Sequence, residues 1–60
     1  MKTYIVIMED RGVEKYREEF LSFNDTNAWS RGRNIARREN GVNGTWGFVV
    51  VNKENPEVTV

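Results

Sequence analysis

The groups with the strongest binding chemistry in this sequence are four arginines within eight positions. They stand in the stretch RGRNIARRENG, residues 31–41. A guanidinium group pairs with a carboxylate or a phosphate through two parallel hydrogen bonds. The stretch can therefore bind an acidic protein surface or a nucleic-acid backbone, and it can equally be the solvated face of an ordinary helix. The candidate binding residues are Trp29, Arg31, Arg33, Asn34, Arg37 and Arg38.

Catalytic groups are scarce by comparison. The chain has no histidine and no cysteine, which removes the commonest general base, the thiol nucleophile and the usual ligands of zinc. Ser22 and Ser30 have no evident activating partner, and Glu18 and Glu19 would point to opposite faces of a strand. We therefore expect a protein that is not an enzyme and that uses no metal ion and no cofactor.

The chain is short, with 60 residues, of which 38% are hydrophobic and 30% are charged. This composition is typical of a globular protein, and the length fits one domain, residues 1–60. A domain of this size buries only a small core. The absence of cysteine agrees with a reducing cytoplasm, and the apolar run of residues 4–8 is too short for a signal-peptide core or a membrane span. We expect a cytoplasmic protein that makes no contact with a membrane.

Four segments have the pattern of strands. Residues 2–9 are β-branched and aromatic, with apolar side chains on both parities, which predicts a strand covered on both faces. A three-residue loop, DRG, follows. Residues 13–22 fit either a strand or a helix, and we favour a strand because a tight loop precedes them and their aromatic side chains suit a sheet. In residues 46–52 the side chains divide between two faces as in a strand, and residues 57–60 can add a short edge strand.

Residues 25–40 carry the clearest helix pattern. Asn24 can cap the N-terminus, because its side-chain oxygen can accept a free backbone N–H. Gly41 fits the left-handed position that ends a helix, with Val42 packing back onto the last turn. Gly32 falls on the inner face, where a residue without a side chain indicates a close approach of the helix to the sheet.

Together these elements predict an α+β fold of ββαβ order. A three- or four-stranded, mainly antiparallel sheet carries one helix packed on one of its faces. At about 100° per residue, the arginines form two pairs, Arg33 with Arg37 and Arg31 with Arg38, and all four point away from the sheet.

One helix covers one face of such a sheet, yet the strands carry apolar residues on both. We therefore expect an open apolar face, and an exposed patch of this kind marks an interface. Stacking two sheets in a homodimer would also enlarge the small core, and docking onto a different protein is the alternative. We expect the homodimer. The residues predicted for the open face are Tyr4, Val6, Tyr16, Phe20, Trp46 and Phe48.

The charge pattern bears on the choice of partner. Residues 27–41 carry four arginines against one glutamate, a net charge of +3, yet the whole chain is neutral and its isoelectric point is about 6.2. Nucleic-acid-binding domains are usually strongly basic. An acidic surface of another protein is therefore preferred over nucleic acid as the partner of the arginines, while a solvated face without a partner stays open.

The order of a hairpin, a strand ending in FNDTNAW, a capped helix and a final strand after glycine resembles the small ββαβ accessory proteins encoded by bacteriophages. Some of those proteins bind and inhibit host polymerases or defence nucleases by surface contact. The resemblance implies a small protein that modulates or inhibits a larger protein or protein–nucleic acid complex. The alternative is a nucleic-acid-binding regulator that uses the arginine-rich helix face.

Overall fold

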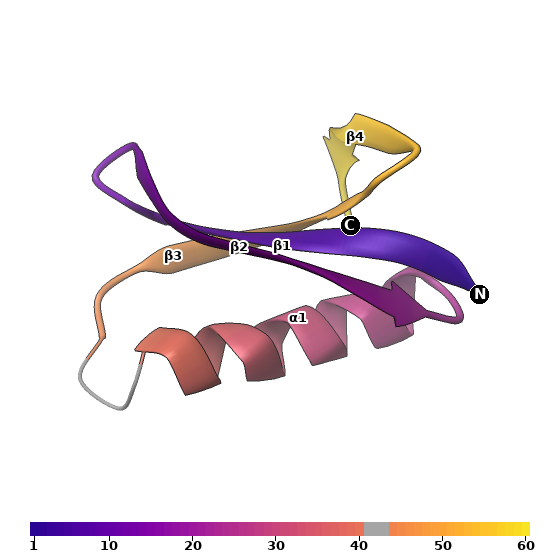
Figure 1. The fold of residues 1–60 in the computed structure, drawn as a ribbon, viewed down its shortest axis with the longest axis horizontal. Helices are drawn as coiled ribbons and strands as arrows, with labels where there is room; N and C mark the ends of the chain where they lie inside the picture. The colour runs from indigo at the N-terminus through magenta and orange to yellow at the C-terminus, as the bar shows by residue number, and fades with distance from the viewer. Residues whose placement is uncertain (41–43) are drawn as a thin grey trace.

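The computed structural model describes residues 1–40 and 44–60. The elements are β1 (Lys2–Asp10), β2 (Val13–Ser22), α1 (Asp25–Asn40), β3 (Gly47–Asn52) and β4 (Asn55–Thr59). The four strands form one antiparallel sheet in the order β2-β1-β3-β4, with α1 along one face (Figure 1). The predicted α+β fold of ββαβ order is confirmed, and the optional fourth strand is present. Among the described residues, no helix has the length and apolar character needed to cross a membrane.

The loop between β1 and β2 is one residue shorter than predicted. Only Arg11 and Gly12 lie between the strands, and both have positive φ angles, 54° and 81°. Two left-handed residues in a two-residue loop are the mark of a type I′ turn, whose twist matches that of the flanking strands. Gly12 suits the left-handed conformation because it has no β-carbon, whereas Arg11 is a less usual residue for it.

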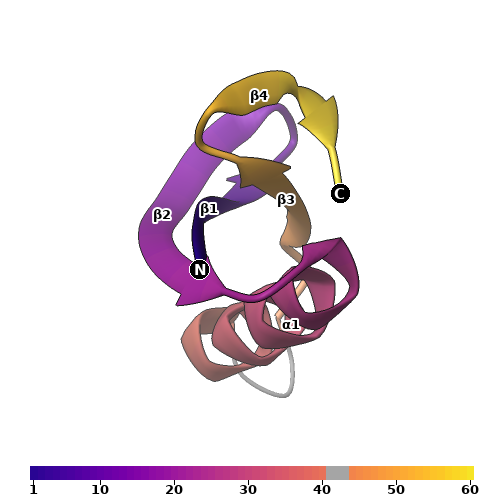
Figure 2. The ribbon, with the colours of Figure 1, turned by 90° about the vertical axis from the view of Figure 1, so that its right-hand side faces the viewer.

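A β-bulge lies two residues beyond the turn. Met8 pairs with Tyr16 and Glu9 pairs with Glu14, so Lys15 is the extra residue on β2. Such a bulge bends the edge strand and increases its local twist. Seen along its length in Figure 2, the sheet is strongly curved, with α1 on its inner side.

The N-terminus of α1 is capped as predicted. The Oδ1 atom of Asn24 accepts a hydrogen bond from the backbone N–H of Asn27 at 2.9 Å, and its carbonyl accepts one from Ala28 at 2.9 Å. The first bond satisfies one of the N–H groups that the first turn leaves free, and the second is the first regular hydrogen bond of the helix. The predicted C-cap at Gly41 and the packing of Val42 lie outside the described residues.

The core lies between α1 and the sheet face that carries the even-numbered side chains of β1, β2 and β3. Its buried members are Tyr4, Val6, Phe20, Ala28, Ile35 and Val50, with Tyr16, Phe48 and Val60 packed against them. The inner face of α1 is formed by small residues, and Gly32 lies against Val50. The predicted close approach of helix and sheet is therefore confirmed, with Val50 as the nearest contact and the ring of Phe20 next to it.

The prediction of which sheet face stays open was wrong. Tyr4 and Val6 are fully buried and Phe20 nearly so, beneath the helix, while Tyr16 and Phe48 pack against the same core. Trp46 precedes β3 and lies beside α1. The alternation of side chains separates two faces of a strand, but it does not say which of two apolar faces the helix will cover. All six residues predicted for the open face therefore lie on the helix side.

The face that α1 leaves open carries the odd-numbered side chains. Ile5 and Val51 lie on it, yet they are only 8% and 4% exposed. Lys53 Nζ donates a hydrogen bond to Glu19 Oε1 at 3.0 Å, and Glu19 pairs across from Ile5 in the sheet. This ion pair joins the end of β3 to β2 across the open face of β1. The open apolar surface is therefore smaller than predicted.

Candidate functional site

The four arginines of α1 fall into two pairs with different surroundings. Arg31 and Arg38 reach toward β2, where they bond to the sheet. Arg33 and Arg37 lie on the other side of the helix, toward Trp46 and β3. The predicted pairing is confirmed, but the prediction that all four point away from the sheet was wrong for the pair on the β2 side.

Arg31 is held by the edge of β2. Its Nη1 atom donates a hydrogen bond of 2.7 Å to the carbonyl oxygen of Leu21. Its guanidinium carbon lies 5.8 Å from the centre of the Phe20 ring, a cation–π distance. Arg31 thus satisfies a strand carbonyl and lies over a core ring, which is a structural role.

Arg38 is held by two carboxylates. Its Nη2 donates to Glu18 Oε1 at 2.7 Å, and its Nε donates to Glu39 Oε2 at 2.8 Å. The same oxygen of Glu18 also accepts a hydrogen bond from the Tyr16 hydroxyl. The Tyr16 hydroxyl, and then Arg38, hold the pKa of Glu18 below its ordinary value of 4.5. Hydrogen bonds to Glu39 and Glu18 raise the pKa of Arg38, so this network joins the end of α1 to β2 and stays charged.

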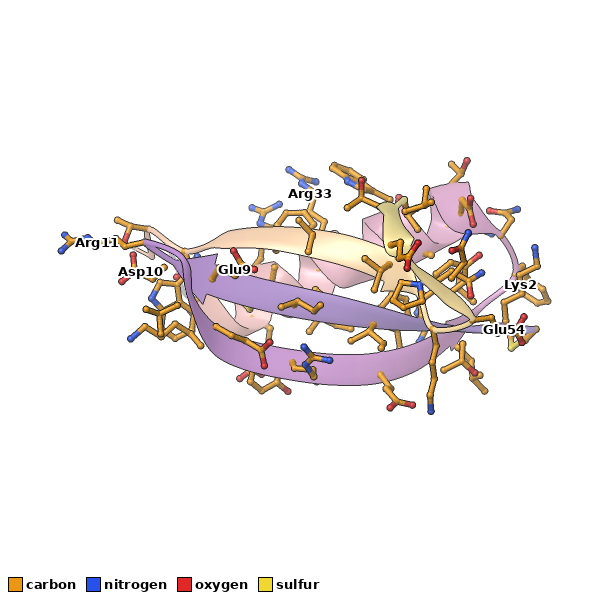
Figure 3. The ribbon with its side chains drawn as sticks, turned by 90° about the horizontal axis from the view of Figure 1, so that it is seen from above. Lys2, Glu9, Asp10, Arg11, Arg33 and Glu54 are labelled. Carbon is orange, nitrogen blue, oxygen red and sulfur yellow. The ribbon has the colours of Figure 1, made fainter. Side chains whose placement is uncertain are left out.

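Arg33 and Arg37 form no ion pair among the described residues. They are four positions apart, which places them side by side on one face of the helix. Seen from above in Figure 3, Arg33 extends past β3 at the margin of the sheet. Together they line a surface groove whose other walls are Ala36, Asn40, Gly44, Trp46 and Phe48.

Two of the other walls of this groove are aromatic, and one of these two is tied to the helix. The Asn40 side-chain amide donates a hydrogen bond of 3.0 Å to the carbonyl of Trp46, which ties the segment before β3 to the last turn of α1. Trp46 and Phe48 are half-buried. Trp29 is 45% exposed, and its ring centre lies 6.0 Å from that of Phe48 at an angle of 45°. We call the residues that line this hollow the arginine–tryptophan groove: Arg33, Ala36, Arg37, Asn40, Gly44, Trp46 and Phe48. Trp29 borders the groove through its contact with Phe48.

The groove has a positive electrostatic character. None of its lining residues is acidic, whereas both arginines carry a full charge at neutral pH. The hollow on the β2 side of the helix is different, because it contains Glu18 beside Arg31, Asn34 and Arg38. Among the residues that line these two hollows, an anion would therefore meet guanidinium groups without a hydrogen bond inside the fold only on the side of Arg33 and Arg37.

The predicted binding residues are thus divided by the fold. Trp29, Arg33 and Arg37 come together at the groove, while Arg31, Asn34 and Arg38 lie on the β2 side. Sequence reasoning assigned Trp46 and Phe48 to the open sheet face and so missed their place beside the arginines. The alternation of side chains could have indicated this place, because Trp46 and Phe48 point to the same face as Val50, the residue that Gly32 approaches.

No comparison supplies an identity for this site. No protein family, curated protein or solved structure matches the chain. Within the described part of the chain, no three acidic side chains gather closely enough to hold a metal ion. The binding chemistry of the site is therefore that of the groove itself, in which two guanidinium groups share a hollow with two aromatic rings.

Proposed function

We propose that this chain is a small, non-enzymatic, cytoplasmic protein that binds an acidic segment of a larger protein through the arginine–tryptophan groove and thereby modulates or inhibits it. One observation carries the proposal: Arg33 and Arg37, the two arginines of α1 whose guanidinium groups bond to no other described residue, line the same groove as Trp46 and Phe48. The role is that of the bacteriophage accessory proteins whose layout the chain resembles.

The residue types suit a protein contact. Arginine and tryptophan are the residues that contribute most to binding energy at protein interfaces, especially where neighbouring groups exclude water. The rings of Trp46 and Phe48 provide apolar area beside the two guanidinium groups, and a bound carboxylate would accept two hydrogen bonds from either arginine. Because Asn40 fixes the backbone at Trp46, the groove needs little ordering when the partner binds.

Single-stranded nucleic acid is the alternative partner, because bases can stack on aromatic rings while arginines neutralise phosphates. The distribution of charge favours the acidic protein. Two of the four arginines in α1 are already bonded within the fold, and the chain as a whole is neutral. Nucleic-acid binding draws most of its affinity from many phosphate contacts, which two free arginines do not supply.

The tryptophans give a direct readout of the groove. The chain has two of them, Trp29 and Trp46, and both border it. We would titrate the protein with a glutamate-rich peptide of about ten residues and, separately, with an oligothymidine of about ten nucleotides, following tryptophan fluorescence. We expect a saturable change with the peptide that weakens as salt is added. Saturation with the oligonucleotide alone would support the alternative, and no change with either probe would exclude both proposals.

A further inference from the structure

The outer side of β2 is a long sheet edge without a partner strand. β2 has ten residues and pairs only with β1, on its inner side. In Figure 2 it is the outermost strand on its side of the molecule, with no described element beyond it. The other edge strand, β4, has five residues and includes Pro56, which cannot donate a hydrogen bond. An unpaired edge of this length is a template for another strand.

The contacts of β2 identify the part of this edge that is free. The carbonyl of Leu21 accepts a hydrogen bond from Arg31, so the backbone of Leu21 points away from β1. Because backbone groups alternate along an antiparallel strand, those of Arg17 and Glu19 also point outward. The bulge at Lys15 limits pairing at one end and the bond of Arg31 limits it at the other. The free stretch is therefore centred on Glu18.

We propose that two copies of this chain associate by pairing β2 with β2 in antiparallel orientation, about a twofold axis at Glu18. In this register Arg17 of each copy lies opposite Glu19 of the other. The surface is separate from the arginine–tryptophan groove, because β2 and the groove lie on opposite sides of α1. The inference therefore stands independently of the proposed function.

The charges on the open face are complementary in this register. Within one copy, Lys53 Nζ lies 3.0 Å from Glu19, and Arg17 Nη2 lies 2.7 Å from Glu14. Pairing the strands joins these two ion pairs into one row of alternating sign: Lys53 and Glu19 of one copy, then Arg17 and Glu14 of the second copy. The twofold axis produces this row twice. All four side chains are about half exposed, so little rearrangement is needed.

Neighbouring registers lack this complementarity. If one strand slides by two residues in one direction, Glu19 lies opposite Glu19 of the second copy. If it slides by two residues in the other direction, Arg17 lies opposite Arg17. Like charges that lie directly opposite each other destabilise a pair of strands. Of these three registers, the one centred on Glu18 is the one in which Arg17 and Glu19 both face an opposite charge.

The helix side of the same register is also compatible. Tyr16 lies opposite Phe20 of the second copy, an aromatic pair of the kind that stabilises adjacent strands. The two Glu18 side chains meet at the axis, but each already accepts hydrogen bonds from Tyr16 and Arg38 of its own copy. Glu18 opposite Glu18 is the like-charge contact of this register, and the Arg38 guanidinium beside each carboxylate offsets it.

Sedimentation equilibrium between about 10 μM and about 1 mM tests the association. We expect the average mass of the protein to rise from 7.0 kDa toward twice that value. A mass that stays at 7.0 kDa through the whole range would overturn the proposal. The double variant Arg33→Glu with Arg37→Glu should dimerise like the wild type. A failure of the binding proposal for the groove is therefore distinguishable from a failure of the dimer proposal for β2.

Charge reversal on β2 tests the register. Arg17→Glu places glutamate opposite Glu19, and Glu19→Arg places arginine opposite Arg17, so we expect each variant alone to dimerise at least about tenfold more weakly. Mixed in equal amounts, the two variants restore opposite charges at both positions and should form a heterodimer. Dimerisation of either single variant at wild-type strength, or a mixture that stays monomeric, would overturn the register. Circular dichroism checks that each variant is folded.

Discussion

Gly32 on α1 lies so close to Val50 on β3 that a β-carbon at Gly32 would overlap the Cγ2 methyl of Val50. The missing side chain lets the helix settle onto the sheet. Arg33 is the next residue along the helix, and it lines the groove together with Phe48, which lies two residues before Val50. The height of the helix above the sheet therefore determines the width of the arginine–tryptophan groove.

We expect Gly32→Ala to destabilise the fold, although alanine favours a helix over glycine by about 1 kcal/mol. The added methyl must displace Val50, and overpacking of this kind costs about 1 to 3 kcal/mol. Val50→Ala removes the obstructing methyl. The loss in free energy of unfolding of the double variant should therefore be smaller than the sum of the losses of the two single variants. Urea denaturation measures all three variants. A Gly32→Ala protein more stable than the wild type would show that the contact is not tight.

Arg11 occupies a position that suits another residue. Its φ angle of 54° lies in the left-handed region, where asparagine is far more common than arginine. We expect Arg11→Asn to stabilise the protein by about 0.5 to 1 kcal/mol, because the new residue adopts the turn with less strain. Thermal unfolding measures the change, and Lys2→Asn, which removes the same charge from an exposed site in β1, should leave stability unchanged. An equal gain in both variants would assign the effect to charge.

Acid should weaken the fold through its bonded carboxylates. Hydrogen bonds from Tyr16 and Arg38 lower the pKa of Glu18, and a hydrogen bond from Arg17 lowers that of Glu14, in both cases from an ordinary value of 4.5. Their stabilisation is fully present above that ordinary value and is lost as pH falls through the lowered pKa. Urea midpoints measured from pH 6 downward should therefore decline below about pH 4.5, and Glu18→Gln should make the decline shallower.

Alkali should weaken the fold through its tyrosines. The hydroxyl of Tyr4 donates a hydrogen bond of 2.7 Å to Asp25, which raises the pKa of Tyr4 above its ordinary value of 10.0, and Glu18 raises that of Tyr16 likewise. This stabilisation is present below pH 10 and is lost as pH rises through the raised pKa. With no histidine and no cysteine in the chain, we expect stability to be nearly flat between the acid and alkaline declines. A transition near pH 6.5 would contradict this assignment.

The division of the arginines predicts different effects on stability. Arg38→Gln removes hydrogen bonds to Glu18 and Glu39, so we expect a lower urea midpoint than in the wild type. Arg37→Gln, one position away, removes no ion pair among the described residues and should leave the midpoint unchanged. Equal midpoints for the two variants would mean that Arg38 is as free as Arg37.

Local patterns in the sequence were sufficient to predict most of the secondary structure. The apolar spacing and the Asn24 cap predicted α1 with its observed bounds, because these signals act within a few residues. The aromatic residues and the preceding tight loop correctly favoured a strand for β2. The loop itself was predicted one residue too long, because nothing in the sequence indicates that Arg11 is left-handed.

Contacts between distant residues could not be predicted in the same way. A helical wheel gives the direction of a β-carbon, but a long arginine side chain can bend back to bond with Glu18 or Leu21 on another element. Likewise, β1 is apolar on both faces, so its sequence does not say which face the helix covers. The groove depends on both relationships, and only its helical residues could be named from the sequence.

The central claim is that Arg33 and Arg37 bind an acidic partner, and two matched double variants test it most directly. Arg33→Glu with Arg37→Glu alters the groove, while Lys2→Glu with Arg11→Glu makes the same change in net charge at the two ends of β1 (Figure 3). Tryptophan fluorescence gives the affinity of each for the glutamate-rich peptide. We expect the groove variant to bind at least about tenfold more weakly than the wild type and the control to stay within about twofold. Equal weakening of both variants would contradict the claim.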